Sequence, residues 1–101
     1  MFIYNVTVKV DWSIHDAWLI WMKEEQIPAM LLTNLFNTYQ MVRLLEVDED
    51  EGPTYAIQYY AASMEAYQQF IHYAAPDFSE KAIRKWGDRF VLFGTLMEVV
   101  N

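Results

Sequence analysis

The segment from Arg89 to Val100 reads RFVLFGTLMEVV and decides the fold. Read as a strand, it alternates between two faces. One face carries Val91, Phe93, Thr95, Met97 and Val99, and the other carries Phe90, Leu92, Gly94, Leu96 and Glu98. Both faces are largely apolar, as in a strand that is covered on two sides. Because a chain of 101 residues can supply one layer of helices but hardly two, we expect a second copy of the sheet to cover the other face.

The composition points to an interface or an aromatic pocket. The 101 residues fit one domain spanning 1–101, with a single core and a high ratio of surface to volume. Hydrophobic residues make up 54% and aromatic residues 17%, including four Trp and seven Tyr. This exceeds what a small monomer needs to bury.

Charge and cysteine content exclude several classes of function. With 14 acidic and 7 basic residues the net charge is -7, so a nucleic-acid partner is not expected. The chain has no cysteine, which fits a cytoplasmic location and removes thiolate chemistry. Its two histidines, His15 and His72, are isolated, and we expect neither a metal site nor a cofactor. No apolar run approaches the roughly 20 residues needed to cross a membrane.

Four segments are predicted to be strands because they alternate at period two or are rich in β-branched and aromatic residues. They are Phe2–Val10, Phe36–Val47, Thr54–Ala61 and Arg89–Val100. An acidic turn over 48–53 joins the second and third strands as a hairpin.

The first helix is predicted from a cap and an apolar stripe. Ser13 and Asp16 form a variant of the capping box that starts a helix at Ile14. Pro28 should kink the helix or restart it, with a second piece over Ala29–Thr33.

The second helix is predicted to begin after Ser63 and to end before Pro76. A short helix, Ser79–Trp86, follows and stops at Gly87. The order is therefore strand, helix, strand, strand, helix, strand. It predicts an α+β, ferredoxin-like fold: a four-stranded antiparallel sheet with the first and third strands central and the helices on one face.

Four stretches, MFIYNVTVKV, WLIWMKEEQIP, TYAIQYY and RFVLFGTLMEVV, resemble a family of short bacterial proteins known as a domain of unknown function. The helix that ends in Gln26-Ile27-Pro28 also resembles one in the dimeric α+β barrel superfamily, which closes with His-Ile-Pro. The resemblance implies a homodimer. That superfamily includes cofactor-free oxygenases, but Gln26 stands at the His position and cannot titrate as a base.

The candidate ligand-binding residues are aromatic or polar groups expected between sheet and helices, namely Trp18, Trp21, Gln26, Tyr59 and His72. A filled aromatic core is the alternative for the same residues. His15, in the first turn of its helix, is expected to point to solvent. The expected dimer interface consists of Ile3, Asn5, Gln58, Tyr60, Leu92 and Leu96.

Two classes of function stay open. One is a homodimer that binds an apolar or aromatic small molecule, or acts on it without a cofactor as an oxygenase-like or isomerase-like enzyme. The other is an interaction module that only dimerises or docks. The residues favour binding or interaction over catalysis, because no titratable group stands at the expected place. Whether the protein is an enzyme is left open.

Overall fold

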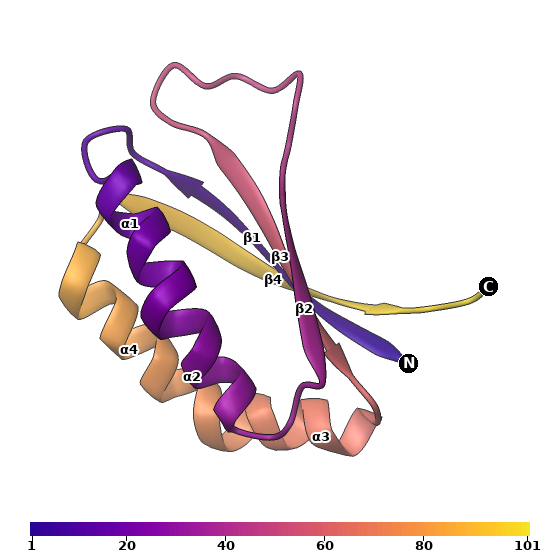
Figure 1. The fold of residues 1–101 in the computed structure, drawn as a ribbon. Helices are drawn as coiled ribbons and strands as arrows, with labels where there is room; N and C mark the ends of the chain where they lie inside the picture. Colours follow the sequence, from indigo (N-terminus) through magenta and orange to yellow (C-terminus); the bar gives the residue numbers. More distant parts are fainter.

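The computed structural model describes residues 1–101 and contains one antiparallel sheet in the order β2-β3-β1-β4. Its strands are β1 (Phe2–Val10), β2 (Thr38–Arg43), β3 (Thr54–Ala61) and β4 (Phe90–Glu98). The first and third strands are central, and the first and last are neighbours, so the predicted ferredoxin-like fold is confirmed (Figure 1).

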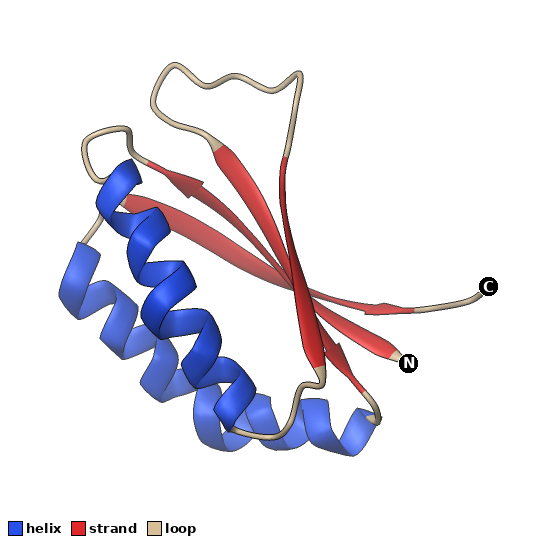
Figure 2. Ribbon diagram, viewed as in Figure 1, coloured by secondary structure: helices blue, strands red, loops and turns tan.

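All the helical segments lie on one face of the sheet, as Figures 1 and 2 show. The first helix is made of α1 (His15–Trp21), η1 (Met22–Gln26) and α2 (Ile27–Leu32). The second is made of α3 (Met64–Gln69), η2 (Phe70–Ala74) and α4 (Ala75–Trp86). No helix covers the opposite face, which we call the open face.

Both helices pass through a proline without a break. The segments η1 and η2 are π turns, in which the N–H of Ile27 donates to Met22 O and that of Ala75 donates to Phe70 O. Each π turn ends two residues before a proline, and its wider ring displaces the carbonyl that the proline would otherwise clash with. The predicted helix end before Pro76 and the predicted restarts at Ala29 and Ser79 are therefore wrong.

Of the two predicted helix caps, one is confirmed and one is wrong. Ser63 Oγ accepts a hydrogen bond of 3.1 Å from the N–H of Ala66, which confirms that cap. At the first helix the capping box is wrong, because Ser13 donates its backbone N–H to Asp11 Oδ1 at 2.8 Å. The residue at the cap position, Ile14, makes no side-chain capping bond.

The second strand is shorter than predicted. It ends at Arg43, since Glu46 adopts a φ of 59° that turns the chain away from the sheet. Ahead of the strand, Phe36 leaves the sheet to join the core, where it is 3% exposed. The loop between β2 and β3 projects beyond the sheet in Figure 1.

The strand register assigns each side chain to a face. Thr7 pairs with Phe93 and Ile3 with Met97, so Phe93 and Met97 share the open face with Ile3. Leu92 pairs with Val8 and Leu96 pairs with Tyr4, which face the helices. The assignment of Leu92 and Leu96 to the open face is therefore wrong.

The core lies between the sheet and the helices. Its largest fully buried side chains include Phe70, Ile27, Ile57 and Val10. None of the helices combines the length and apolar character that a membrane crossing requires.

Candidate functional site

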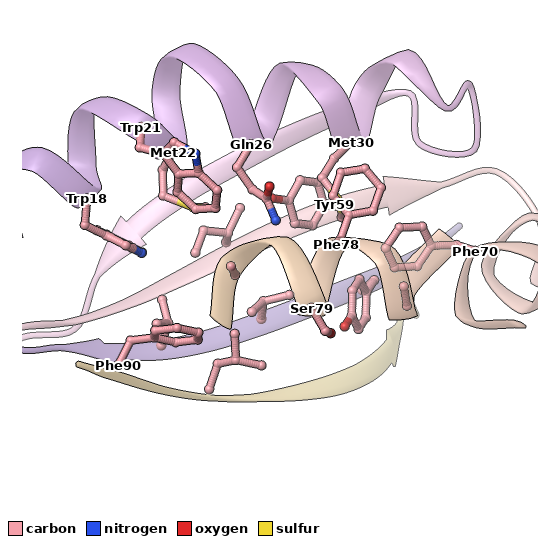
Figure 3. Close-up of a pocket in the computed structure, with 17 residues that line it drawn as sticks. Trp18, Trp21, Met22, Gln26, Met30, Tyr59, Phe70, Phe78, Ser79 and Phe90 are labelled. Carbon is pink, nitrogen blue, oxygen red and sulfur yellow. The ribbon is translucent and has the colours of Figure 1, made fainter. Parts of the chain in front are cut away.

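A cavity of about 80 Å³ lies between the helices and the sheet (Figure 3). Of the 17 residues that line it, 15 are hydrophobic. They come from both helices and from β1, β3 and β4, so the cavity occupies the centre of the α/β layer. The aromatic residues therefore do not fill the core completely.

Four of the five predicted ligand residues line this cavity, namely Trp18, Trp21, Gln26 and Tyr59. Trp18 and Trp21 are 2% and 4% exposed, so their indole rings are walls of the cavity. The fifth, His72, does not line it. It lies exposed on η2, with its ring 6.4 Å from that of Tyr73, so its predicted place in the site is wrong.

Two methionines that were not predicted from the sequence, Met22 and Met30, belong to the same wall. With Trp18 and Gln26 they follow each other at intervals of four residues, which places them on one helix face. This spacing was the signal that could have identified them.

Gln26 is the polar side chain that the first helix contributes to the wall of the cavity. It is the last residue of the π turn η1, and Figure 3 shows its amide among the aromatic rings. Its Oε1 is buried and has no hydrogen-bond partner. One other buried side-chain polar atom, Trp86 Nε1, is also unpaired, and Trp86 does not line the cavity. An unpaired buried carbonyl is unfavourable by about 1–3 kcal/mol, so a hydrogen-bond donor that reached this oxygen would be favoured.

The cavity opens between α4 and β4. Among its lining residues only Ser79 on α4 and Leu92 on β4 are exposed. Beside Leu92, Gly94 leaves β4 without a side chain where the ring of Tyr4 lies, and a Cβ there would be 2.8 Å from Tyr4 Cε1. Tyr4 also lines the cavity, so its ring is part of the wall near this opening.

The phenols of the cavity are kept protonated by burial. Loss of solvent raises the pKa of Tyr59 well above its ordinary value, and nearby Tyr4 and Tyr39 raise it further. Burial likewise raises the pKa of Tyr4, with a smaller contribution from Tyr67. Neither phenol can therefore act as a base near neutral pH.

We expect the free energy of unfolding to fall as the pH rises above about 10, the ordinary pKa of tyrosine. Tyr59 has a raised pKa in the folded state, so above pH 10 the unfolded chain loses this proton first and is favoured. Tyr59→Phe should make the fall of the unfolding free energy with pH less steep by up to about 1.4 kcal/mol per pH unit. Urea unfolding between pH 9 and 11 measures it. Tyr73→Phe, at a residue that is 80% exposed, is the control, and equal slopes in both variants would contradict the prediction.

His15 does not point to solvent as predicted. Its Nε2 lies 2.7 Å from Tyr55 Oη, its Nδ1 lies 3.1 Å from Asp16 Oδ1, and its ring stacks on Tyr55 at an interplanar angle of 8°. The ring of Trp12 lies 5.3 Å from the imidazole at an interplanar angle of 76°. This cluster ties the start of α1 to β3, and neither His15 nor Tyr55 lines the cavity.

No group of three or more His, Asp or Glu side chains is arranged to hold a metal ion. Besides apolar contact, the residues that line the cavity offer one amide, the two indole N–H groups of Trp18 and Trp21, and three hydroxyl groups. These hydroxyls belong to Tyr4, Tyr59 and Ser79.

Comparison with known proteins identifies a family and a fold. Residues 1–100 match the family described as "Domain of unknown function (DUF4286)". No curated protein matches the chain.

Solved structures with the same fold have low sequence identity. A dimeric ferredoxin-like protein from an uncultured marine organism is 10% identical with a TM-score of 0.74, over 99% of this chain and 95% of that one. An ethyl tert-butyl ether D (EthD) family protein from Bacillus halodurans is 14% identical with a TM-score of 0.68, over 99% and 100%. HapK from Hahella chejuensis is 10% identical with a TM-score of 0.69, over 99% and 93%. At such identities the likeness establishes the fold alone.

Proposed function

The chain belongs to this family of unknown function, and we propose that it is a homodimeric protein that binds a small, uncharged molecule in the cavity of each subunit. The observation that carries the binding role is the buried, unpaired Oε1 of Gln26 in an apolar cavity. A ligand with an N–H or O–H group would satisfy this oxygen and place its apolar part against Trp18 and Trp21.

The lining argues for an uncharged ligand. No charged side chain lines the cavity, so an ion entering it would lose its hydration without gaining a partner. An aromatic or aliphatic group with one donor matches the amide and the ring walls. This complementarity defines the ligand class that we propose.

The small volume of the cavity means that side chains of its wall would have to move for such a molecule to enter. At about 80 Å³ the cavity is smaller than the 300–1,000 Å³ typical of ligand sites. Met22 and Met30 are flexible side chains in the wall, and movement of such residues is a common way for a core to adapt. A single ring enters as these side chains rearrange, and a larger ligand extends through the opening between Ser79 and Leu92.

The homodimer is supported by the open face. Its strand residues, as the register assigns them, are Ile3, Asn5, Thr7, Lys9, Thr38, Gln40, Val42, Thr54, Ala56, Gln58, Tyr60, Val91, Phe93, Thr95 and Met97. Lys9 is the only charged residue among them, in a chain that is 21% charged. Val91 and Phe93 are 69% and 62% exposed. Depletion of charge with exposed apolar and aromatic groups is typical of the centre of an interface.

Binding is favoured over catalysis within this proposal. The titratable groups of the cavity are phenols whose pKa values are raised by burial, and Gln26 does not titrate. A cofactor-independent enzyme would need a base poised near its working pH. An interaction module without a ligand would need no cavity with an unpaired amide.

The test of binding is Gln26→Leu, which should have opposite effects on stability and on affinity. Without ligand, the variant should be about 1 kcal/mol more stable, because a buried carbonyl without a partner is removed. Phenol should bind it about five-fold more weakly than it binds the native protein, whereas toluene, which has no donor, should bind both equally. Fluorescence of Trp18 and Trp21 reports binding, and urea unfolding reports stability.

Gln69→Leu is the matched control, because it replaces an exposed amide at the end of α3. It should change neither the stability nor the affinity for phenol. If neither probe alters the fluorescence or the melting temperature of the native protein, the binding proposal fails and the interaction module stands.

A further inference from the structure

A row of polar side chains crosses the middle of the open face. Gln40 pairs with Gln58, Gln58 pairs with Asn5, and Asn5 pairs with Thr95, so the row spans all four strands. We call these four residues the polar row. Each lies near the middle of its strand, so the row lies across the centre of the face.

The rows on either side of the polar row are more apolar. One consists of Val42, Ala56, Thr7 and Phe93, and the other consists of Thr38, Tyr60, Ile3 and Met97. Three amide-bearing residues therefore stand in line between two rows that carry aromatic and aliphatic groups. Apolar contact alone would hold two such faces together in several alignments, because it has no direction.

The amides of the polar row have hydrogen-bonding capacity left over. Within the chain, Asn5 Nδ2 donates to Thr7 Oγ1 at 3.0 Å, and this bond leaves Asn5 Oδ1 free. The side chains of Gln40 and Gln58 make no hydrogen bond to another residue of the chain. Each amide offers both donors and an acceptor, so a row of amides is complementary to a second copy of itself.

Two-fold symmetry brings the polar row onto its own copy. When two sheets face each other, the two-fold axis lies between them and parallel to them. An axis along the row places Gln58 over its own counterpart, and an axis along the strands places Gln58 over the partner's Asn5. Both operations set an amide of one subunit against an amide of the other at the centre of the face.

We propose that the polar row fixes the alignment of the two subunits across their open faces. This inference rests on the proposed homodimer and adds the residues that select one arrangement of it. A shift of one subunit by two residues along a strand, about 6.6 Å, sets amides of the row against Val42 and Ala56 or against Ile3, and leaves those amides buried without partners. Buried amides specify alignment in this way at the interfaces of coiled coils.

The proposal can be tested by electron spin resonance on the full-length protein. This method measures the distance between two nitroxide labels, one on each subunit. The native sequence has no cysteine, so Lys81→Cys on the exposed side of α4 gives one label per subunit. In this labelled background we expect one narrow distance. Asn5→Leu combined with Gln58→Leu should keep the dimer but give a broad distribution or additional distances, because apolar contacts tolerate several alignments.

The control is Thr54→Val, which replaces a hydroxyl by a methyl group of similar size. Thr54 lies on the same face, outside the polar row. It should keep the single narrow distance, and circular dichroism should give the same spectrum for all variants. A single unchanged distance in the double variant would overturn the role of the row while the homodimer stands. Dissociation of the double variant would overturn it too, since the row would then supply affinity. A native protein that is monomeric would refute the homodimer itself.

Discussion

Phe93→Asp is expected to convert the protein from a dimer of twice the 12.0 kDa chain mass into a monomer. Phe93 is 62% exposed in the single chain and lies on the open face, so the carboxylate does not disturb the fold of one subunit. In a dimer it would bury two unpaired charges, each unfavourable by several kcal/mol. The dissociation constant should rise on the order of 10⁴-fold, which light scattering at micromolar concentration detects.

Leu96→Asp is the matched control for this prediction. Leu96 belongs to the same strand, three residues further on, but its partner in the register is Tyr4 on the face of the helices. Its side chain is 37% exposed there, and the variant should remain dimeric. A dimeric Phe93→Asp variant would contradict the proposed interface. A monomeric Leu96→Asp variant would show that the helix-facing side of β4 is the one that associates.

The face of β4 that lies against the helices could not be predicted from the sequence alone. Alternation separates Phe93 from Leu96, but both sets of side chains on β4 are apolar, so the pattern itself does not say which set faces the helices. The pairing of Thr7 with Phe93 decides this, and it depends on contacts between residues far apart in the chain. The order of the elements was predictable because strand alternation and helix stripes are local signals.

Part of the candidate site was predictable from the spacing of residues along the first helix. Trp18 and Gln26 lie eight residues apart, and their common wall follows from the helical period. His72 was assigned wrongly because it stands two residues after the buried Phe70 and therefore points to the opposite side of the helix. His15 was assigned wrongly because its partner, Tyr55, is 40 residues away, and no local pattern predicts that contact.

The cavity and the open face are built from opposite sides of the same central strands. On β3, Tyr59 lines the cavity, and its neighbour Gln58 belongs to the polar row. On β1, Tyr4 and Asn5 divide in the same way. A ligand that moves the walls of the cavity therefore acts on the strands that carry the proposed interface. Coupling between ligand binding and dimer formation can be tested by measuring the dissociation constant of the dimer with and without phenol.

Gly52→Ala is expected to lower the free energy of unfolding by about 3 kcal/mol or more. A Cβ at Gly52 would lie 2.6 Å from the carbonyl carbon of Val10 and closer still to its oxygen, and backbone atoms cannot rotate away. The loop would have to leave β1, breaking the bonds of 3.0 Å from the N–H groups of Val10 and Trp12 to Pro53 O and Glu51 O. Urea unfolding at fixed protein concentration measures the loss.

Glu51→Ala truncates an exposed side chain next to Gly52 and keeps its backbone carbonyl, so it should stay within about 0.5 kcal/mol of the native protein. Equal stability of the two variants would mean that the loop does not need its close approach to β1.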